Sequence, residues 1–160
     1  MKAYFFGNFM LSSIQQGIQA AHVLAEMMLE YSNPANTDGQ ILHEWASSHK
    51  TIQLMNGGNQ QDLLELKSFF ETMDDGSLPW GWFNEDFNSL NDCLTSVGIV
   101  VPDHITKLTE ESGRKPVSSK LVGIDNNVLI YHEGSEIVEI EYTSFEIQLA
   151  DKLKKYRYAN

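Results

Sequence analysis

The chain has 160 residues, with eleven basic and twenty-two acidic side chains and a net charge of −11. This length fits one domain, and we expect residues 1–160 to form a single domain. The charge disfavours long polyanions over most of the surface, but it is compatible with a small anionic ligand in a local pocket. Cys93 is the single cysteine, which excludes an internal disulfide and suits a reducing compartment, so we expect a cytoplasmic protein.

The apolar segments indicate no membrane association. The N-terminal apolar stretch is interrupted by Gly7 and Asn8 and is followed by a Gln-rich segment, which does not resemble a signal peptide. The longest apolar run, Val97 to Val101, is far too short to span a bilayer. We therefore expect no membrane partner.

The first hundred residues alternate between strand and helix patterns. Aromatic and alternating runs predict strands, helical spacing of apolar residues predicts helices, and turn formers separate them. In chain order we expect a strand at 2–7, a helix at 12–31, a loop at 33–39, a short helix or turn at 43–49, a strand at 51–56, a helix at 60–73, a loop at 74–86 and a buried strand at 94–101. This alternation favours an α/β fold, a three-layer sandwich with a small mixed sheet flanked by helices.

The pattern changes after Pro102. Residues 103–119 are polar, and we expect a mobile segment there. Residues 120–142 contain three strand-like pieces separated by hairpin signals, which predicts a β-hairpin element. Residues 144–155 predict a closing helix capped by Ser144, and residues 156–159 a final strand.

The first helix carries the most informative pattern. Ser12 and Ser13 are good N-cap residues, and Ser13 with Gln16 fits a capping box. A polar stripe runs along a helix that is otherwise apolar nearly all round, which predicts a buried helix; its members are Gln15, Gln19, His22 and Glu26. Such a stripe either forms an internal hydrogen-bond network or lines a site. The helix N-terminus would suit a phosphate, and Gly17 would let a neighbour approach closely.

The stretch QQGIQAAHV at residues 15–23 resembles the first-helix signature of type II peptidyl-tRNA hydrolases. That signature is Gly-Lys, two residues, Ala-Gln, two residues and His-Ala, so Gln19 and His22 match its Gln and His. The segment FNED at 83–86, then Leu94-Thr95 and the apolar strand, is similar to the acidic residue, threonine and last core strand of short phage and bacterial variants. The resemblance implies a core of 1–102 and 144–160 and an inserted loop with hairpins at 103–143.

The resemblance also contains one departure. The family's catalytic Lys falls on Gln15, which is neutral and can only form hydrogen bonds. Together with the negative charge, this makes tRNA a less expected partner than a small ligand. The scaffold is therefore expected to serve another, nucleotide-type ligand.

Other residues complete the predicted site. Asp86 is expected as a general base beside His22, with Glu85 next to it, although both could be ordinary loop acids. Trp80 and Trp82 would stack on a base or close over the core, and Asn91 and Thr95 would bind ligand or simply end a strand. The predicted ligand-binding residues are Ser12, Ser13, Gln15, Gln19, Trp80, Trp82, Glu85, Asn91 and Thr95. No histidine or cysteine spacing fits a metal site, and no glycine fingerprint fits a cofactor, so we expect neither.

Three functions remain open. The first is a hydrolase-like scaffold that binds, and in one version hydrolyses, a nucleotide-derived ligand, in the manner of a phage anti-defence protein that acts on a host nucleotide immune signal. The second is an active peptidyl-tRNA hydrolase. The third is a protein-interaction module in which the inserted hairpins pair with a partner or with another copy, which would make a homo-oligomer.

Overall fold

The structure is a computed structural model that describes all residues except 74, 87–90, 110–117, 123–125, 134 and 160. The chain divides into two compact units. The first contains Met1–Pro102 and Tyr156–Asn160, and the second contains Asp103–Lys155. The boundary at Pro102 coincides with the predicted end of the core, while the predicted core segment 144–160 is divided between the units.

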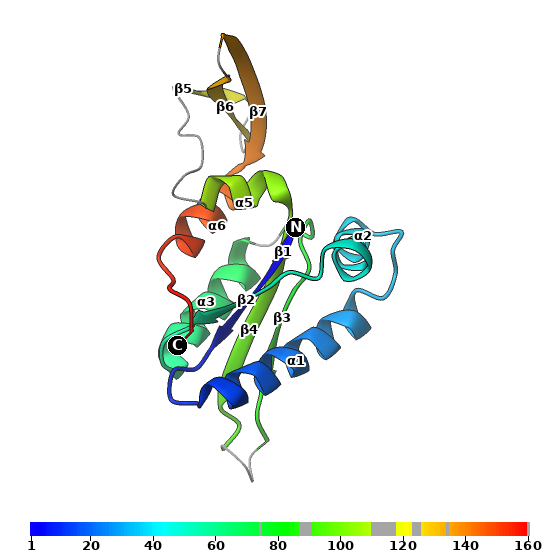
Figure 1. The fold of residues 1–160 in the computed structure, drawn as a ribbon, viewed down its shortest axis with the longest axis vertical. Coiled ribbons are helices and arrows are strands. Elements are labelled where there is room, and N and C mark those ends of the chain that lie inside the picture. The colour runs from blue at the N-terminus through cyan, green and yellow to red at the C-terminus, as the bar shows by residue number, and fades with distance from the viewer. Residues whose placement is uncertain (74, 87–90, 110–117, 123–125, 134, 160) are drawn as a thin grey trace. The chain divides into compact units, whose positions relative to one another are not determined.

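The first unit is a mixed four-stranded sheet with helices on both faces (Figure 1). The strand order is β2-β1-β4-β3; β1 is parallel to β2 and antiparallel to β4, and β3 is antiparallel to β4. The elements are β1 Lys2–Gly7, α1 Ser13–Glu30, α2 Thr37–Glu44, the π-helix η1 Trp45–His49, β2 Ile52–Asn56, α3 Gln60–Met73, β3 Trp80–Asn84 and β4 Leu94–Val101. Helix α1 covers one face and α3 the other, which confirms the predicted three-layer α/β sandwich.

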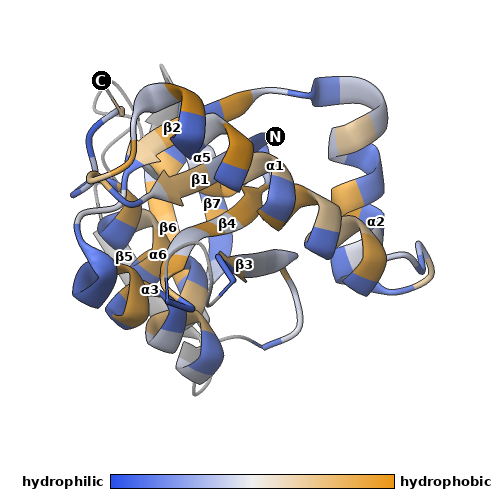
Figure 2. Cartoon of the chain, turned by 90° about the horizontal axis from the view of Figure 1, so that it is seen from below, coloured by the Kyte–Doolittle hydropathy of each residue, from blue (hydrophilic) through white to orange (hydrophobic). Residues whose placement is uncertain are grey.

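The central strands are apolar because both of their faces are covered by helices (Figure 2). All eight residues of β4 are buried, as its continuous apolar run predicted. Strand β3 was not predicted, because its five residues lie inside the segment 74–86 that we expected to be a loop. Gly81 and the turn formers before Trp80 conceal a strand in which Trp80 and Trp82 lie on one face and Gly81 and Phe83 on the other.

Helix α1 is amphipathic, and the prediction that it is buried on all sides is wrong. Its buried face consists of Gln16, Gln19, Ala20, Val23 and Met27. On the opposite side the exposed fractions reach 79% for Ile14, 50% for Ile18 and 74% for Leu29. The apolar residues that suggested a buried helix therefore lie on a solvent-facing surface.

A pair of glycines allows α1 to lie close to the sheet. Gly81 of β3 and Gly98 of β4 are opposite each other in the ladder. A Cβ atom at Gly81 would lie 2.8 Å from Cγ of Met27, and one at Gly98 would lie 2.6 Å from the Phe5 ring and 3.0 Å from Val23. Gly17, which was expected to mark a close approach, has no atom within 4 Å of such a Cβ. The close contact is thus made on the sheet, not at Gly17.

The C-terminal segment covers the β2 edge of this sheet. The amide of Asn56 donates to the carbonyl of Arg157 at 2.8 Å, and the amide of Ala159 donates to the carbonyl of Leu54 at 2.9 Å. The final strand predicted at 156–159 is reduced to a single bridge between Met55 and Tyr158. The ring of Tyr156 packs on Phe6 with centroids 4.6 Å apart.

The second unit is a three-stranded antiparallel sheet with two helices. Its elements are α5 Asp103–Thr109, β5 Ser118–Val122, β6 Asn126–Glu133, β7 Glu136–Thr143 and α6 Ser144–Leu153, and the strand order is β5-β6-β7. The three predicted strand pieces are confirmed. Helix α5 occupies the start of the segment 103–119 that was expected to be mobile, residues 110–117 lie outside the described residues, and the last two residues of the segment belong to β5. The N-cap of α6 is Thr143, not the predicted Ser144; it forms a capping box with Glu146.

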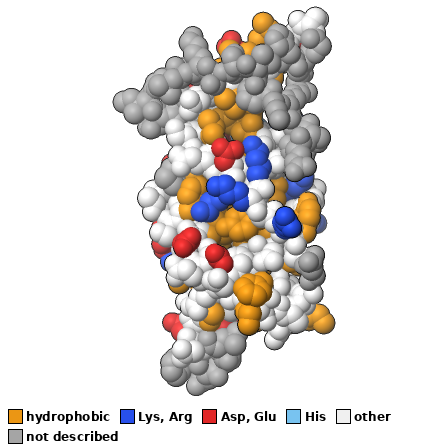
Figure 3. Space-filling model, turned by 90° about the vertical axis from the view of Figure 1, so that its left-hand side faces the viewer, with side chains coloured by type: hydrophobic (Ala, Val, Ile, Leu, Met, Phe, Trp, Pro, Cys, Tyr) orange, Lys and Arg blue, Asp and Glu red, His pale blue; other side chains and the backbone are white. Residues whose placement is uncertain are grey.

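The surface is chemically mixed. Figure 3 shows a face on which basic, acidic and apolar side chains lie side by side, so the charge of −11 is not a uniform field. Across the described part of the chain, no helix is both long enough and apolar enough to cross a membrane.

We expect Gly98→Ala to lower the free energy of unfolding by about 1–3 kcal/mol, because the added methyl overlaps the rigid Phe5 ring in a packed core. The matched control is Gly17→Ala, which adds the same methyl in open space on α1 and should raise stability by about 0.5–1 kcal/mol. Urea denaturation of both variants tests this. Equal effects of the two substitutions would contradict the close packing around Gly98.

Burial, with the nearby charges of Asp62 and Glu65, raises the pKa of Tyr156 from 10.0 to about 12. The folded state therefore favours the neutral phenol, whose stabilising contribution is complete below pH 10 and is lost as the pH rises through about 12. We expect Tyr156→Phe to flatten the alkaline decline of the unfolding free energy, measured by urea denaturation over this range. The exposed Tyr158 offers the control: if Tyr158→Phe flattens the decline equally, Tyr156 has no special role.

Candidate functional site

The N-terminus of α1 is capped by the side chains of Ser12 and Gln15. The Ser12 hydroxyl accepts from the Gln15 amide, and the Gln15 side chain accepts from the Ser12 amide at 2.9 Å. The capping box is therefore Ser12 with Gln15, not Ser13 with Gln16; Ser13 is the first residue of the helix. Gln16 is buried instead, donates to the carbonyl of Leu11 at 2.8 Å and packs against Gly7. Gln15 is thus engaged in capping.

One turn further along α1, Gln19 forms the centre of a hydrogen-bond network. Its Nε2 donates to Oε2 of Glu85 at 2.7 Å, and its Oε1 accepts from Oγ1 of Thr95 at 2.7 Å. The Thr95 hydroxyl also lies 3.0 Å from the carbonyl oxygen of Phe83. Gln19 and Thr95 are both buried. Three predicted site residues that are distant in the sequence therefore meet, and they tie α1 to the ends of β3 and β4.

His22 lies next to this network on the exposed side of α1. Its ring stacks on Phe83, with centroids 4.4 Å apart and planes at 13°. Because Phe83 is two residues before Glu85, the imidazole and the carboxylate belong to the same part of the surface. Asp86, the predicted base, follows Glu85 and is exposed.

The two predicted tryptophans differ in role. Trp80 is 8% exposed and packs against Phe70 at a centroid distance of 5.4 Å, so it closes over the core. Trp82 is 41% exposed, and Nζ of Lys67 lies 4.2 Å from its ring centroid. Of the two, only Trp82 presents an accessible aromatic surface.

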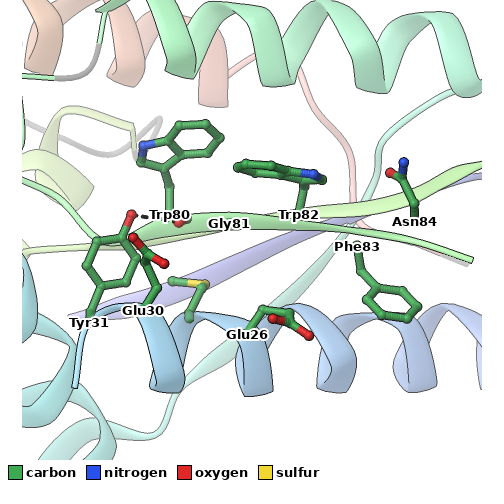
Figure 4. Close-up of a pocket in the computed structure, with 9 residues that line it drawn as sticks. Glu26, Glu30, Tyr31, Trp80, Gly81, Trp82, Phe83 and Asn84 are labelled. Atoms are coloured by element: carbon green, nitrogen blue, oxygen red, sulfur yellow. Dashed lines mark hydrogen bonds between the residues drawn. The ribbon is translucent and has the colours of Figure 1, made fainter.

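A groove of about 560 Å³ lies between α1 and the edge strand β3 (Figure 4). This volume falls within the usual range for small-molecule sites. We call it the β3-edge groove; it is lined by Glu26, Met27, Glu30, Tyr31, Trp80, Gly81, Trp82, Phe83 and Asn84. The Tyr31 hydroxyl donates to the carbonyl of Trp80 at 2.9 Å and so fixes one end of the groove.

The backbone of β3 also faces this groove. The Val100 amide donates to the carbonyl of Pro79 at 3.0 Å, and the ladder continues with Gly81 opposite Gly98. In an antiparallel ladder, residue pairs that exchange backbone hydrogen bonds alternate with pairs that do not. Since Pro79 and Gly81 belong to the bonded pairs, Trp82 directs its N–H and C=O away from β4, toward the open edge. The β2 edge is covered by the C-terminal segment, so the sheet offers its backbone groups at β3.

Not all predicted site residues belong to this region. Gln15 precedes Glu26 by eleven residues, or about 16 Å along the helix axis, so Ser12, Ser13 and Gln15 lie outside the groove. Asn91 is exposed with a φ of 55°, in a left-handed turn before β4, and is not at the end of a strand. Burial raises the pKa of the Cys93 thiol. The described residues contain no group of three metal-ligating side chains.

The groove residues absent from the predicted ligand contacts are Glu26, Met27, Glu30, Tyr31, Gly81, Phe83 and Asn84; of these, Glu26 was named as a member of the polar stripe of the first helix. One signal was available for two of them. Glu26 and Glu30 are one helical turn apart, and no basic residue follows in the last turn of α1. Acids at the C-terminal end of a helix are unfavourable for the helix itself.

We expect Thr95→Val to destabilise the protein by about 1–3 kcal/mol, because it leaves the buried Gln19 Oε1 without a donor. In a double-mutant cycle with Gln19→Leu, the loss of stability of the double mutant should differ from the sum of the two single losses by about 0.5–3 kcal/mol. The control is Thr106→Val, which removes a buried hydroxyl whose bond is to Asp103 in its own helix and should add independently. Additive effects for Thr95 and Gln19, measured by urea denaturation, would argue against the network.

Comparison with known proteins does not add to these contacts. The chain matches no family model, and no curated protein matches it.

Proposed function

We propose that the chain is a peptidyl-tRNA hydrolase-like scaffold that binds a small nucleotide-derived ligand at the β3 edge. The observation that carries the proposal is the Trp82 ring, 41% exposed on the α3 side of this edge strand, next to the groove of about 560 Å³ on the α1 side and to the Gln19–Glu85–Thr95 network. Base stacking on an aromatic ring is worth about 1–3 kcal/mol per base and requires an accessible ring face.

The surrounding groups support a ligand of this kind. The outward N–H and C=O of Trp82 supply a donor and an acceptor at the edge strand, the pairing that a nucleobase edge needs. The Asn84 side chain adds an amide, which offers both hydrogen-bond roles. His22 and Asp86 remain the residues that we assign to turnover, if the bound ligand is hydrolysed. The role that we propose is phage anti-defence, by capture or cleavage of a host nucleotide immune signal.

We expect native mass spectrometry of the protein, incubated with a panel of linear and cyclic nucleotides, to show the mass of the protein increased by that of one bound nucleotide. Trp82→Ala should weaken that binding by about 5- to 150-fold, in line with the loss of one stacked base. The control Tyr158→Ala removes an aromatic ring that is more exposed, at the opposite sheet edge, and should leave binding unchanged.

The small molecules recovered from the same incubation separate capture from cleavage. An intact ligand indicates sequestration, whereas a product that disappears with His22→Ala indicates hydrolysis. Absence of any mass shift across the panel would overturn the proposal. Release of blocked amino acids from peptidyl-tRNA by the same protein would favour the hydrolase activity that the resemblance implies.

A further inference from the structure

The two edges of the four-stranded sheet differ in the backbone groups that they leave open. At the β2 edge the amide of Asn56 donates to residue 157 and the carbonyl of Leu54 accepts from residue 159, so the C-terminal segment covers this strand. At the other edge β3 pairs only with β4 among the described residues. The Trp82 N–H and C=O point outward from β3, where an added strand would bond to them.

The open part of this edge is short. The Tyr31 hydroxyl already donates to the carbonyl of Trp80 at 2.9 Å, at one end of β3. At the other end the register with β4 shifts between Phe83 and Asn84, an irregularity of the kind that ends regular pairing. The accessible stretch is therefore centred on Trp82, and it suits an extended segment of a few residues.

A strand added at β3 reaches both faces of the sheet. Its side chains alternate between the faces, so a residue opposite Trp82 lies on the α3 side and the residues before and after it lie on the α1 side. The groove of about 560 Å³ on the α1 side would receive the latter. One extended partner thereby contacts both faces of β3, although the strand separates them.

The α1 side of the edge is negatively charged. Glu26 and Glu30 lie one helical turn apart on the α1 wall of the groove, and both are exposed (Figure 4). No lysine or arginine lines the groove, and among the described residues neither carboxylate is in an ion pair. Charge complementarity therefore favours Lys or Arg at those positions of an added strand that enter the groove.

The α3 side of the edge has a different character. The Trp82 ring is 41% exposed there, and Nζ of Lys67 lies 4.2 Å from its centroid. Lys67 is itself paired with Glu71, so the charges beside the ring are balanced. An apolar side chain opposite Trp82 would form a cross-strand pair with the ring, whereas a basic one would lie beside Lys67.

The same charges disfavour a second copy of this chain at the edge. Two β3 strands paired about a twofold axis would place both α1 helices on one face and bring their acids near each other. Each chain also carries a net charge of −11, which opposes self-association. A basic segment meets neither form of repulsion.

We propose that β3 takes up an extended basic segment of a partner protein as an added antiparallel strand. Its Lys or Arg side chains lie toward Glu26 and Glu30, and its apolar side chains lie toward Trp82. Antiparallel pairing is the more stable arrangement per residue. The inference does not rest on the nucleotide proposed above, but both ligands use the outward backbone groups of Trp82 and would compete for them.

Fluorescence anisotropy with a labelled peptide of alternating lysine and valine, Lys-Val-Lys-Val-Lys-Val-Lys, tests this proposal in the absence of nucleotide. In the proposed register the valine amides face Trp82 and the lysine amides face away. Methylation of the valine nitrogens should weaken binding about 5- to 150-fold, whereas methylation of the lysine nitrogens should change it little. If the two methylated peptides bind alike, whether tightly or not at all, backbone pairing is refuted.

A block peptide of the same composition, Lys-Lys-Lys-Lys-Val-Val-Val, separates strand addition from general attraction to an acidic protein. It has the same charge without the alternation, so we expect it to bind more weakly than the alternating peptide at physiological salt. Equal binding of the two peptides would overturn the inference.

Charge reversal on α1 tests the choice of basic side chains. The double variant Glu26→Lys with Glu30→Lys should lose the Lys-Val peptide and bind an alternating Glu-Val peptide instead. Both positions are exposed in the C-terminal half of α1, where the helix dipole favours cations, so the variant should fold. The control, Glu44→Lys with Asp151→Lys, makes the same change of charge at exposed acids outside the groove and should still prefer the Lys-Val peptide. A control that switches preference equally would contradict the proposed site.

Two substitutions at Trp82 separate its backbone from its ring. Trp82→Ala keeps the outward amide, whereas Trp82→Pro also removes it, at a position of an edge strand where proline costs no bond to β4. The proline variant should bind the Lys-Val peptide about 2- to 10-fold more weakly than the alanine variant. Sedimentation of the protein alone covers the remaining occupant: a dimer that the peptide dissociates would assign the edge to a second copy and overturn the inference.

Discussion

The close approach of α1 to the sheet is the constraint on which the rest of the first unit depends. It is possible because Gly81 and Gly98 face each other across β3 and β4, where a side chain on either would meet Met27 or Phe5. With α1 at this distance, the short Gln19 side chain reaches Thr95 and Glu85 directly. A helix held farther away would leave these buried polar groups unpaired, at a cost of about 1–3 kcal/mol each.

The same packing creates the groove. Gly81 has no side chain to fill the space between β3 and α1, and Glu26 lies on the α1 wall of this space, whereas the Trp82 ring projects from the opposite face of β3. Since β3 is an edge strand, nothing in the described part of the first unit extends the sheet beyond it, whereas the β2 edge is covered by backbone bonds from residues 157–159. The asymmetry between the two edges leaves accessible backbone groups at β3, with Glu26 and Glu30 on its α1 side and the Trp82 ring on its α3 side.

The sequence predicted those parts of the fold whose patterns are local. The continuous apolar run of β4 and the hairpin signals around residues 125 and 134 are patterns formed by neighbouring residues in the chain. Strand β4 and the three strands of the second unit accordingly appear where they were expected. Strand β3 was missed because an edge strand of five residues with a glycine at its second position has little periodicity. Helix α1 was placed correctly but judged fully buried, because composition alone does not distinguish an apolar outer face from an inner one.

The polar stripe of α1 illustrates the limit on predicting a site. Sequence spacing left an internal network and a ligand site as alternatives; the structure shows the network at Gln19 and an open groove beside Glu26, on the same helix. Gln19 is buried and paired with residues 66 and 76 positions away, whereas His22 and Glu26, on the same stripe, are exposed and lie at or in the groove. The partners of a polar side chain decide between the two roles, and those partners come from strands that only the folded sheet brings to the helix. A buried network beside exposed polar groups gives the latter a rigid support, which is the arrangement that a binding site requires.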